Sequence, residues 1–248
     1  YLGKPRAEED WNFELIKKYS NTKMVANIIL ARQARVEKLL QELKEPRRVD
    51  RWMTSPLIVN AFYSRVDNKF TLPLGILQKP FFDPEASDQS NLALIGTTIG
   101  HELSHAFDEH GAQYDKTGKN VNWFTRHDVR EFAEKREQFV KIFNKLGYNG
   151  ELSRDENIAD HVGLFYAYQA AAPANVEEKK NFFISYARIW CTVSSPGFQQ
   201  RYLKTADHAW PVERVNQQVV HLDGFYEAFS CQDSDKMYLP HSERIRFW

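Results

Sequence analysis

Two histidines four residues apart, His101 and His105, lie in the apolar stretch 91–107 and constrain its fold more than any other feature. Because a helix turns about 100° per residue, both imidazoles lie on one helix face and reach one common point. Glu102 follows the first histidine and flanks the same face. Burying these three side chains without partners costs several kcal/mol. The stretch therefore predicts a buried helix whose polar groups share a partner; its apolar residues are Ile99, Leu103, Ala106 and Phe107.

A zinc ion is a partner that satisfies all three groups. Two imidazoles at this spacing both reach a point about 2.0–2.1 Å from a nitrogen of each ring. Glu102 does not join the ligands, but it lies where a general base takes a proton from water. The five-residue pattern also occurs on ordinary helices that carry His and Glu for solubility. The buried surroundings favour the metal site.

A catalytic zinc site needs a third protein ligand and an open position. Glu156 and Asp160 are four residues apart in a segment with an apolar stripe, so both carboxylates face the same way on a predicted helix. One is expected to reach the metal and the other a ligand histidine. A Glu and an Asp at this spacing also commonly form a solvated helix face.

The charge balance disfavours polyanionic partners. Lys plus Arg and Asp plus Glu each total 33, so nothing favours nucleic acid or an anionic membrane surface. No apolar run approaches the roughly 20 residues that cross a bilayer, so we expect no transmembrane segment. The first ten residues are polar and begin without Met, so they resemble neither a signal peptide nor a translation start. We expect a piece of a longer chain.

Only two cysteines, Cys191 and Cys231, are present. This number excludes a disulfide-rich scaffold and a four-cysteine zinc site. The two thiols can be free, bonded to each other, or bonded to chain outside this sequence. The redox compartment stays open at this point.

Hydrophobic periodicity predicts a mainly α fold with a small β-sheet (α+β). Two segments rich in β-branched and aromatic residues, 56–64 and 69–77, predict paired strands with Asp67 and Asn68 between them. A polar loop is expected over 80–90 and a turn-rich segment over 112–124. Apolar residues at helical spacing predict helices over 22–43, 125–146, 154–172, 177–190 and 211–220.

Three separated motifs occur in one order: VNAFYS at 59–64, HELSHAFD at 101–108 and ENIAD at 156–160. Together they resemble the neprilysin and endothelin-converting enzyme family of zinc metallopeptidases. The likeness continues from about Val59 to the C-terminal Trp248. It implies a thermolysin-like zinc peptidase domain over 1–248. Family members are much longer, so the chain is expected to be their C-terminal third, with an N-terminal lobe as its missing partner.

The resemblance implies a role for each matching residue. His101, His105 and Glu156 would bind one Zn²⁺ per chain, with Glu102 as general base. Asp160 would hold His101 and act as a second catalytic carboxylate, while Asp108 would hold His105. His208 would donate to the oxyanion of the reaction intermediate. A lone histidine in a loop is otherwise more often a solvated residue.

The substrate residues also follow from the resemblance. Asn60 and Ala61 would clamp an extended peptide along an edge strand, and Arg214 would hold a substrate carbonyl. An apolar pocket after the cut bond, which implies cleavage before hydrophobic residues, would be lined by Phe81, Ile189 and Trp190. Without the likeness, these three would be ordinary core residues.

The chain departs from animal family members at one disulfide. Phe139 and Ile245 occupy the two places where those proteins have a cysteine pair, so apolar packing is expected there. Cys191 and Cys231 match family cysteines whose partners lie in the absent part. This favours a secreted protein or an ectodomain, with a cytoplasmic peptidase as the alternative.

The sequence thus predicts a zinc-dependent endopeptidase acting on small to medium peptides. One alternative is a catalytically impaired module of the same fold that binds peptides without cutting them. Another is a purely structural helical domain with accidental motifs.

Overall fold

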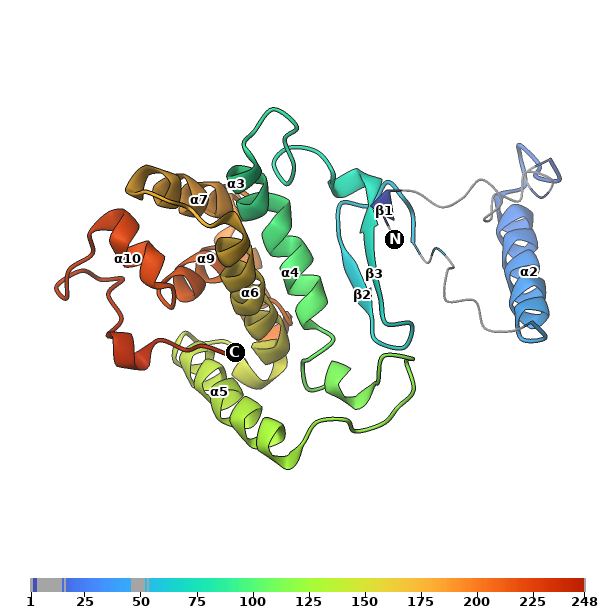
Figure 1. Cartoon of the computed structure of the whole chain (residues 1–248). Helices are drawn as coiled ribbons and strands as arrows, with labels where there is room; N and C mark the ends of the chain where they lie inside the picture. The colour runs from blue at the N-terminus through green and yellow to red at the C-terminus, as the bar shows by residue number, and fades with distance from the viewer. Residues whose placement is uncertain (1, 4–14, 16, 46–51, 53, 248) are drawn as a thin grey trace.

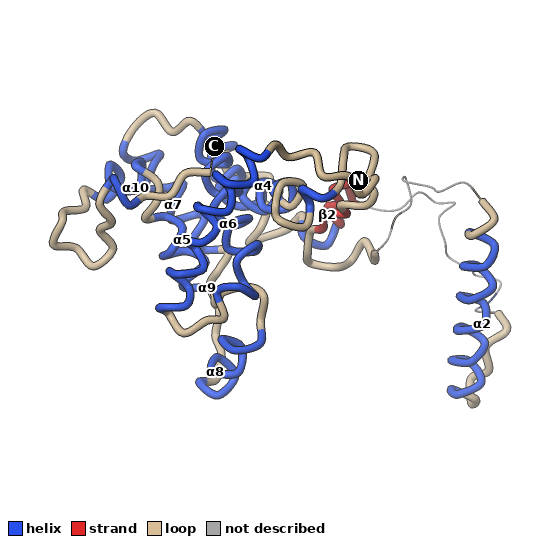
Figure 2. Tube along the Cα trace, turned by 90° about the horizontal axis from the view of Figure 1, so that it is seen from below, coloured by secondary structure: helices blue, strands red, loops and turns tan. Residues whose placement is uncertain are grey.

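A computed structural model of the protein describes residues 2–3, 15, 17–45, 52 and 54–247. A body of helices lies beside a small sheet, and α2 (Met24–Glu42) stands apart from both (Figures 1 and 2). This arrangement confirms the predicted mainly α fold with a small sheet. No helix among the described residues is both long and apolar enough for a bilayer.

The sheet has three strands, in the order β1 (Leu2–Gly3), β3 (Lys69–Pro73), β2 (Phe62–Ser64). β2 and β3 form the predicted pair, which is antiparallel, whereas β1 pairs parallel with β3 and was not predicted. Asn68 in the connecting turn has a φ of 44°, a conformation that Asn tolerates better than most residues.

The prediction of a strand over 56–64 is wrong in its first part. Residues 56–61 form no strand, so Asn60 and Ala61 precede β2 instead of lying on an edge strand. The carbonyl of Pro56 accepts a hydrogen bond from the Gly75 amide at 2.8 Å. A Cβ on Gly75 would lie 2.5 Å from the Leu57 oxygen, so this turn packs directly on the Gly75 backbone.

The predicted helices are confirmed with small shifts at their ends. Three further helices, α3, α8 and α10, were not predicted, and α3 begins inside the segment predicted as a polar loop. The helices after the sheet are α3 (Asp88–Asn91), α4 (Thr97–Ser104), α5 (Arg126–Lys145), α6 (Gly150–Ala171), α7 (Val176–Arg188), α8 (Pro196–Thr205), α9 (Pro211–Val219) and α10 (Asp223–Phe229). Single turns of 3₁₀ helix lie at Leu74–Ile76, Gly111–Gln113 and His241–Glu243.

The helix that carries the two histidines is shorter and less buried than predicted. A π-turn at Leu92–Gly96 joins α3 to α4, and α4 ends at Ser104 with His105 as its C-cap. Leu103 and Phe107 are 47% and 43% exposed, so the outer face is not covered. The buried face of α4 instead carries His101 and Glu102.

α6 is the central helix of the body. It contacts α4, α5, α9 and the π-turn, and one apolar cluster lies on each side of it. Phe139 and Ile245 share one of these clusters, as expected at the two sites where animal relatives have cysteines. Cys191 and Cys231 are both free thiols and are not joined to each other.

Two buried histidines fasten the C-terminal segment to this cluster. His221 accepts a hydrogen bond from the Ile245 amide through Nδ1 at 3.1 Å, and the His161 ring meets the His221 ring edge-on at 5.3 Å. Burial, and then the charge of His221, lower the pKa of His161 to about 3. Burial, and then Arg244, lower that of His221 to about 4. Both rings are therefore neutral in the folded protein near pH 6.

These histidines make the fold sensitive to acid. Above pH 6.5 they are neutral in both the folded and the unfolded chain, so their full contribution to the stability of the fold is present. As the pH falls from 6.5 toward 4, only the unfolded chain gains their protons, and stability is lost by up to about 1.4 kcal/mol per pH unit for each histidine. The free energy of unfolding can be measured by urea denaturation between pH 7.5 and 4.5. Its dependence on pH should be weaker in His161→Phe, by up to about 1.4 kcal/mol per pH unit, than in the parent. Equal slopes in the two proteins would contradict the assignment.

Candidate metal centre and active site

Three side chains from α4 and α6 meet at one point. His101 and Glu156 lie on α4 and α6, and His105 follows the last residue of α4. The Nε2 atoms of the two histidines are 3.2 Å apart, and the Glu156 Oε2 atom lies 3.1 Å from the first and 3.7 Å from the second. All three atoms lie within 4.8 Å of one another. The structure thus brings together the three predicted metal ligands.

The other nitrogen of each ring is held by a carboxylate. His101 Nδ1 lies 2.8 Å from Asp160 Oδ1, and His105 Nδ1 lies 2.8 Å from Asp108 Oδ2. Asp108 is fixed in turn by the backbone amides of His110 and Gly111. An Nδ1–H donated to a carboxylate leaves the Nε2 lone pair free to bind a cation. Asp108 and Asp160 therefore occupy the positions predicted for them.

The charges around this point favour a cation. Burial lowers the pKa of His101, but its hydrogen bonds to Asp160 and Glu156 outweigh burial and raise it to about 9. Burial raises the pKa of Glu156, but its hydrogen bonds to His101 and His208 outweigh burial and bring it well below its usual range. The site therefore stabilises positive charge where the three atoms converge. Two imidazole nitrogens and one carboxylate oxygen are a donor set that fits zinc.

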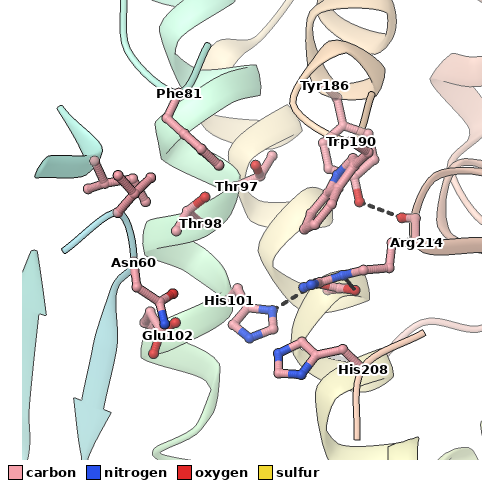
Figure 3. A pocket seen from close by; sticks show the side chains of 13 residues that line it. Asn60, Phe81, Thr97, Thr98, His101, Glu102, Tyr186, Trp190, His208 and Arg214 are labelled. Carbon is pink, nitrogen blue, oxygen red and sulfur yellow. Dashed lines mark hydrogen bonds and ion pairs between the residues drawn. The ribbon is translucent and has the colours of Figure 1, made fainter. Parts of the chain in front are cut away.

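Glu102 is buried on α4 next to His101, and Figure 3 shows its side chain on the side of Asn60 and not directed at the His101 ring. Its pKa is raised because burial disfavours the charged form. Its placement agrees with the role of a proton acceptor that is not itself a ligand.

His208 reaches the site from the loop before α9. Its Nε2 atom is 2.9 Å from Glu156 Oε2 and its Nδ1 atom is 2.8 Å from Asp207 Oδ1. Its ring stacks nearly parallel to that of His101, with 6.2 Å between centroids. Burial lowers its pKa, but the hydrogen bond to Glu156 outweighs burial, so the net shift is upward. The predicted residue is therefore at the site.

Arg214 is bound to Asp160 through two of its nitrogens. Its Nε donates to Oδ2 at 2.7 Å and its Nη2 to Oδ1 at 2.6 Å, while its guanidinium lies 3.9 Å above the Trp190 ring. Burial raises the pKa of Asp160, but Arg214 and His101 outweigh it and lower the value to about 2. Arg214 thus keeps Asp160 ionised. Its predicted grip on a substrate carbonyl stays a prediction.

A cavity of about 140 Å³ opens beside His101 (Figure 3). Asn60, Phe81 and Trp190 line it, as predicted. Two predicted substrate residues do not: Ala61 and Ile189 are buried in the apolar clusters behind the cavity. Their apolar character is explained by packing alone.

Several residues that shape the site were missed from the sequence. Asp207 holds His208, and the Tyr186 hydroxyl donates to the Arg214 carbonyl at 2.7 Å. The Tyr148 hydroxyl accepts the amide hydrogen of Trp210, two residues after His208, and donates to Glu213. Asp207 was detectable as the neighbour of a candidate histidine; the two tyrosines carry no local signal.

The motifs and this geometry can be compared with known proteins. The sequence model of peptidase family M13 matches residues 60–245. The chain belongs to this family.

Curated relatives include the neutral endopeptidase of Lactococcus lactis, 38% identical over 79% of this chain, and human neprilysin, 32% identical over 93%. The chain spans about a third of their length, 32% and 33%. Two solved M13-like structures each cover 99% of this chain and are matched over 40% of their own length. They are PepO from Lactobacillus rhamnosis, with a TM-score of 0.85 and 30% identity, and the Mycobacterium tuberculosis zinc metalloprotease ZMP1 with an inhibitor, with a TM-score of 0.87 and 31% identity.

Glu156→Gln tests the ligand set directly. A neutral amide is a poorer zinc ligand than a carboxylate, so the variant should lose most of its zinc on dialysis while the parent keeps one zinc per chain. Elemental analysis measures this. Glu151→Gln, which changes an exposed residue on the same helix, is the matched control and should retain zinc. Equal zinc content in all three proteins would show that Glu156 is not a zinc ligand.

Proposed function

We propose that this chain carries the catalytic centre of a zinc-dependent endopeptidase that hydrolyses small to medium peptides. The observation that carries the proposal is the convergence of His101 Nε2, His105 Nε2 and Glu156 Oε2 within 4.8 Å. The M13 relationship supports it. A zinc ion held there would supply a Lewis acid that acidifies water and polarises a peptide carbonyl.

Glu102 is the proton carrier in this mechanism. It lies on the same helix face as His101, and its raised pKa brings it closer to the pH at which a carboxylate both accepts and returns a proton. Glu102 takes a proton from the attacking water and passes it to the leaving amine. One carboxylate thereby serves both halves of the hydrolysis.

His208 and Asp160 have distinct supporting roles. His208 is held by Asp207 through Nδ1, and its Nε2, which lies 2.9 Å from Glu156 Oε2, would turn to donate to the oxygen that becomes negative during attack. Asp160 keeps the His101 ring in its ligating orientation, and Arg214 keeps Asp160 charged. Asp160 acts through His101, so it is a positioning carboxylate in this proposal.

The cavity is where specificity would arise. Its volume is close to that of engineered apolar cavities of about 150 Å³ that bind benzene. Asn60 lines it and would hold an extended peptide, while Phe81 and Trp190 offer apolar walls. We infer a preference for cleavage on the amino side of hydrophobic residues.

Chain outside this stretch would complete the protein. α2 has no buried residue, and Val25, Ile29 and Leu40 each expose more than half of their surface. We infer that an N-terminal lobe covers this helix, restricts substrate size and supplies partners for Cys191 and Cys231, in a secreted protein or ectodomain.

Glu102→Gln should separate metal binding from turnover. The amide keeps the shape of the side chain but cannot accept the proton, so the variant should keep zinc and lose several orders of magnitude in kcat. A fluorogenic peptide with and without chelator measures turnover, and elemental analysis measures zinc. Parent-like cleavage by the variant would refute the role of Glu102. Tight peptide binding by the parent without chelator-sensitive cleavage would favour a peptide-binding module.

A matched peptide series tests the pocket. Peptides that differ only in the residue after the cut should be cleaved at least ten times faster with Phe or Leu there than with Asp or Lys, because the Phe81 and Trp190 walls do not solvate charge. Mass spectrometry identifies the cut bond, and initial rates give kcat/KM. Equal rates across the series would contradict the inferred preference.

A further inference from the structure

The two ligand-bearing helices touch through their backbones at one pair of glycines, Gly100 on α4 and Gly163 on α6. A Cβ added to Gly100 would lie 2.8 Å from the Gly163 Cα and 3.0 Å from its carbonyl oxygen. One added to Gly163 would lie 2.6 Å from both the His101 amide nitrogen and the Thr97 oxygen. Separations below 3.0 Å from backbone atoms leave no space for any side chain. The helices therefore approach as closely as glycine allows.

This contact lies beside the metal-binding groups. Gly100 is the residue before His101, and Gly163 follows Asp160 by three residues and Glu156 by seven, so all three α6 positions share one face. The atoms that a Gly163 side chain would strike, Thr97 oxygen and His101 nitrogen, are joined in the α-helical hydrogen-bond pattern of α4. A side chain at 163 would press on the helical turn that presents His101.

Helix propensity does not explain either glycine. Alanine is the better helix former at an interior position, so each glycine costs intrinsic stability. Neither residue has a positive φ, so neither position needs the left-handed conformation. Gly100 and Gly163 are thus explained by the close approach of the two backbones.

We propose that Gly100 and Gly163 are positioning residues for the metal centre: their contact sets the spacing at which Glu156 and Asp160 reach His101. His101 Nε2 lies 3.1 Å from Glu156, and His101 Nδ1 lies 2.8 Å from Asp160. Both distances therefore depend on the separation of α4 and α6. The inference rests on the proposed zinc site and adds the element that fixes its geometry.

The test compares Gly163→Ala and Gly100→Ala with the parent and with Gly197→Ala. Gly197 on α8 is the matched control, since its Cβ would meet only the Arg201 side chain at 3.8 Å. The zinc dissociation constant is measured by chelator competition, at a temperature below the thermal unfolding midpoint of each protein. The absorption spectrum of the cobalt-substituted proteins reports ligand geometry.

We expect the zinc dissociation constant to rise at least tenfold in Gly163→Ala, with an altered cobalt spectrum, a lower kcat and little change in KM. Gly100→Ala should show a smaller rise in the zinc dissociation constant, because its added Cβ would lie slightly farther from the neighbouring backbone. If Gly163→Ala does not fold, Gly100→Ala serves as the test variant. Gly197→Ala should match the parent. Variants that lose thermal stability but keep the parent's zinc affinity and cobalt spectrum would overturn the inference alone. A parent that binds no zinc would overturn the proposed function as well.

Discussion

The contact between α4 and α6 is the constraint on which the rest of the site depends. One helix supplies His101 and Glu102, and the other supplies Glu156 and Asp160. Neither helix holds a complete site. Because α6 is also packed against α5, α9 and the π-turn, its position is fixed by the whole body of helices. The core therefore works as a scaffold that sets one interhelical separation, and the site's short distances follow from that separation.

Arg214 extends this constraint to the C-terminal part of the chain. Its guanidinium spans both oxygens of Asp160 and stacks on Trp190, so α9 and the residues after α7 are tied to α6 at the ligand turn. Tyr148 makes a second tie, from the start of α6 to the start of α9. His208 lies just before these two attachments in the sequence, and its own contacts with Glu156 and Asp207 hold its ring at the site.

Local patterns predicted which side chains converge, because His101 and His105 are one helical turn apart, and so are Glu156 and Asp160. The spacing of His101 and His105, and that of Glu156 and Asp160, follow from helical periodicity alone. The resemblance placed His208 and Arg214, whose partners are more than fifty residues away. The strand over 56–61 was wrong because the contact with Gly75 overrides β propensity. The resemblance placed Ile189 in the pocket and Ala61 against the substrate, but both side chains are buried in apolar clusters.

The balance of charge explains why one carboxylate differs from the others. Asp108, Glu156, Asp160 and Glu102 lie around the site, and Arg214 is the cation bonded to one of them. Burial lowers the pKa values of His101 and His208, but the neighbouring carboxylates outweigh burial and raise both, so the excess of carboxylates draws positive charge to the site. A divalent cation at the three ligand atoms would offset most of the excess. Asp160 and Glu156 have direct hydrogen-bonding partners that keep them ionised. For Glu102, burial prevails over the histidine charges, so its pKa rises. The carboxylate least compensated by its neighbours is thus the one suited to exchange a proton.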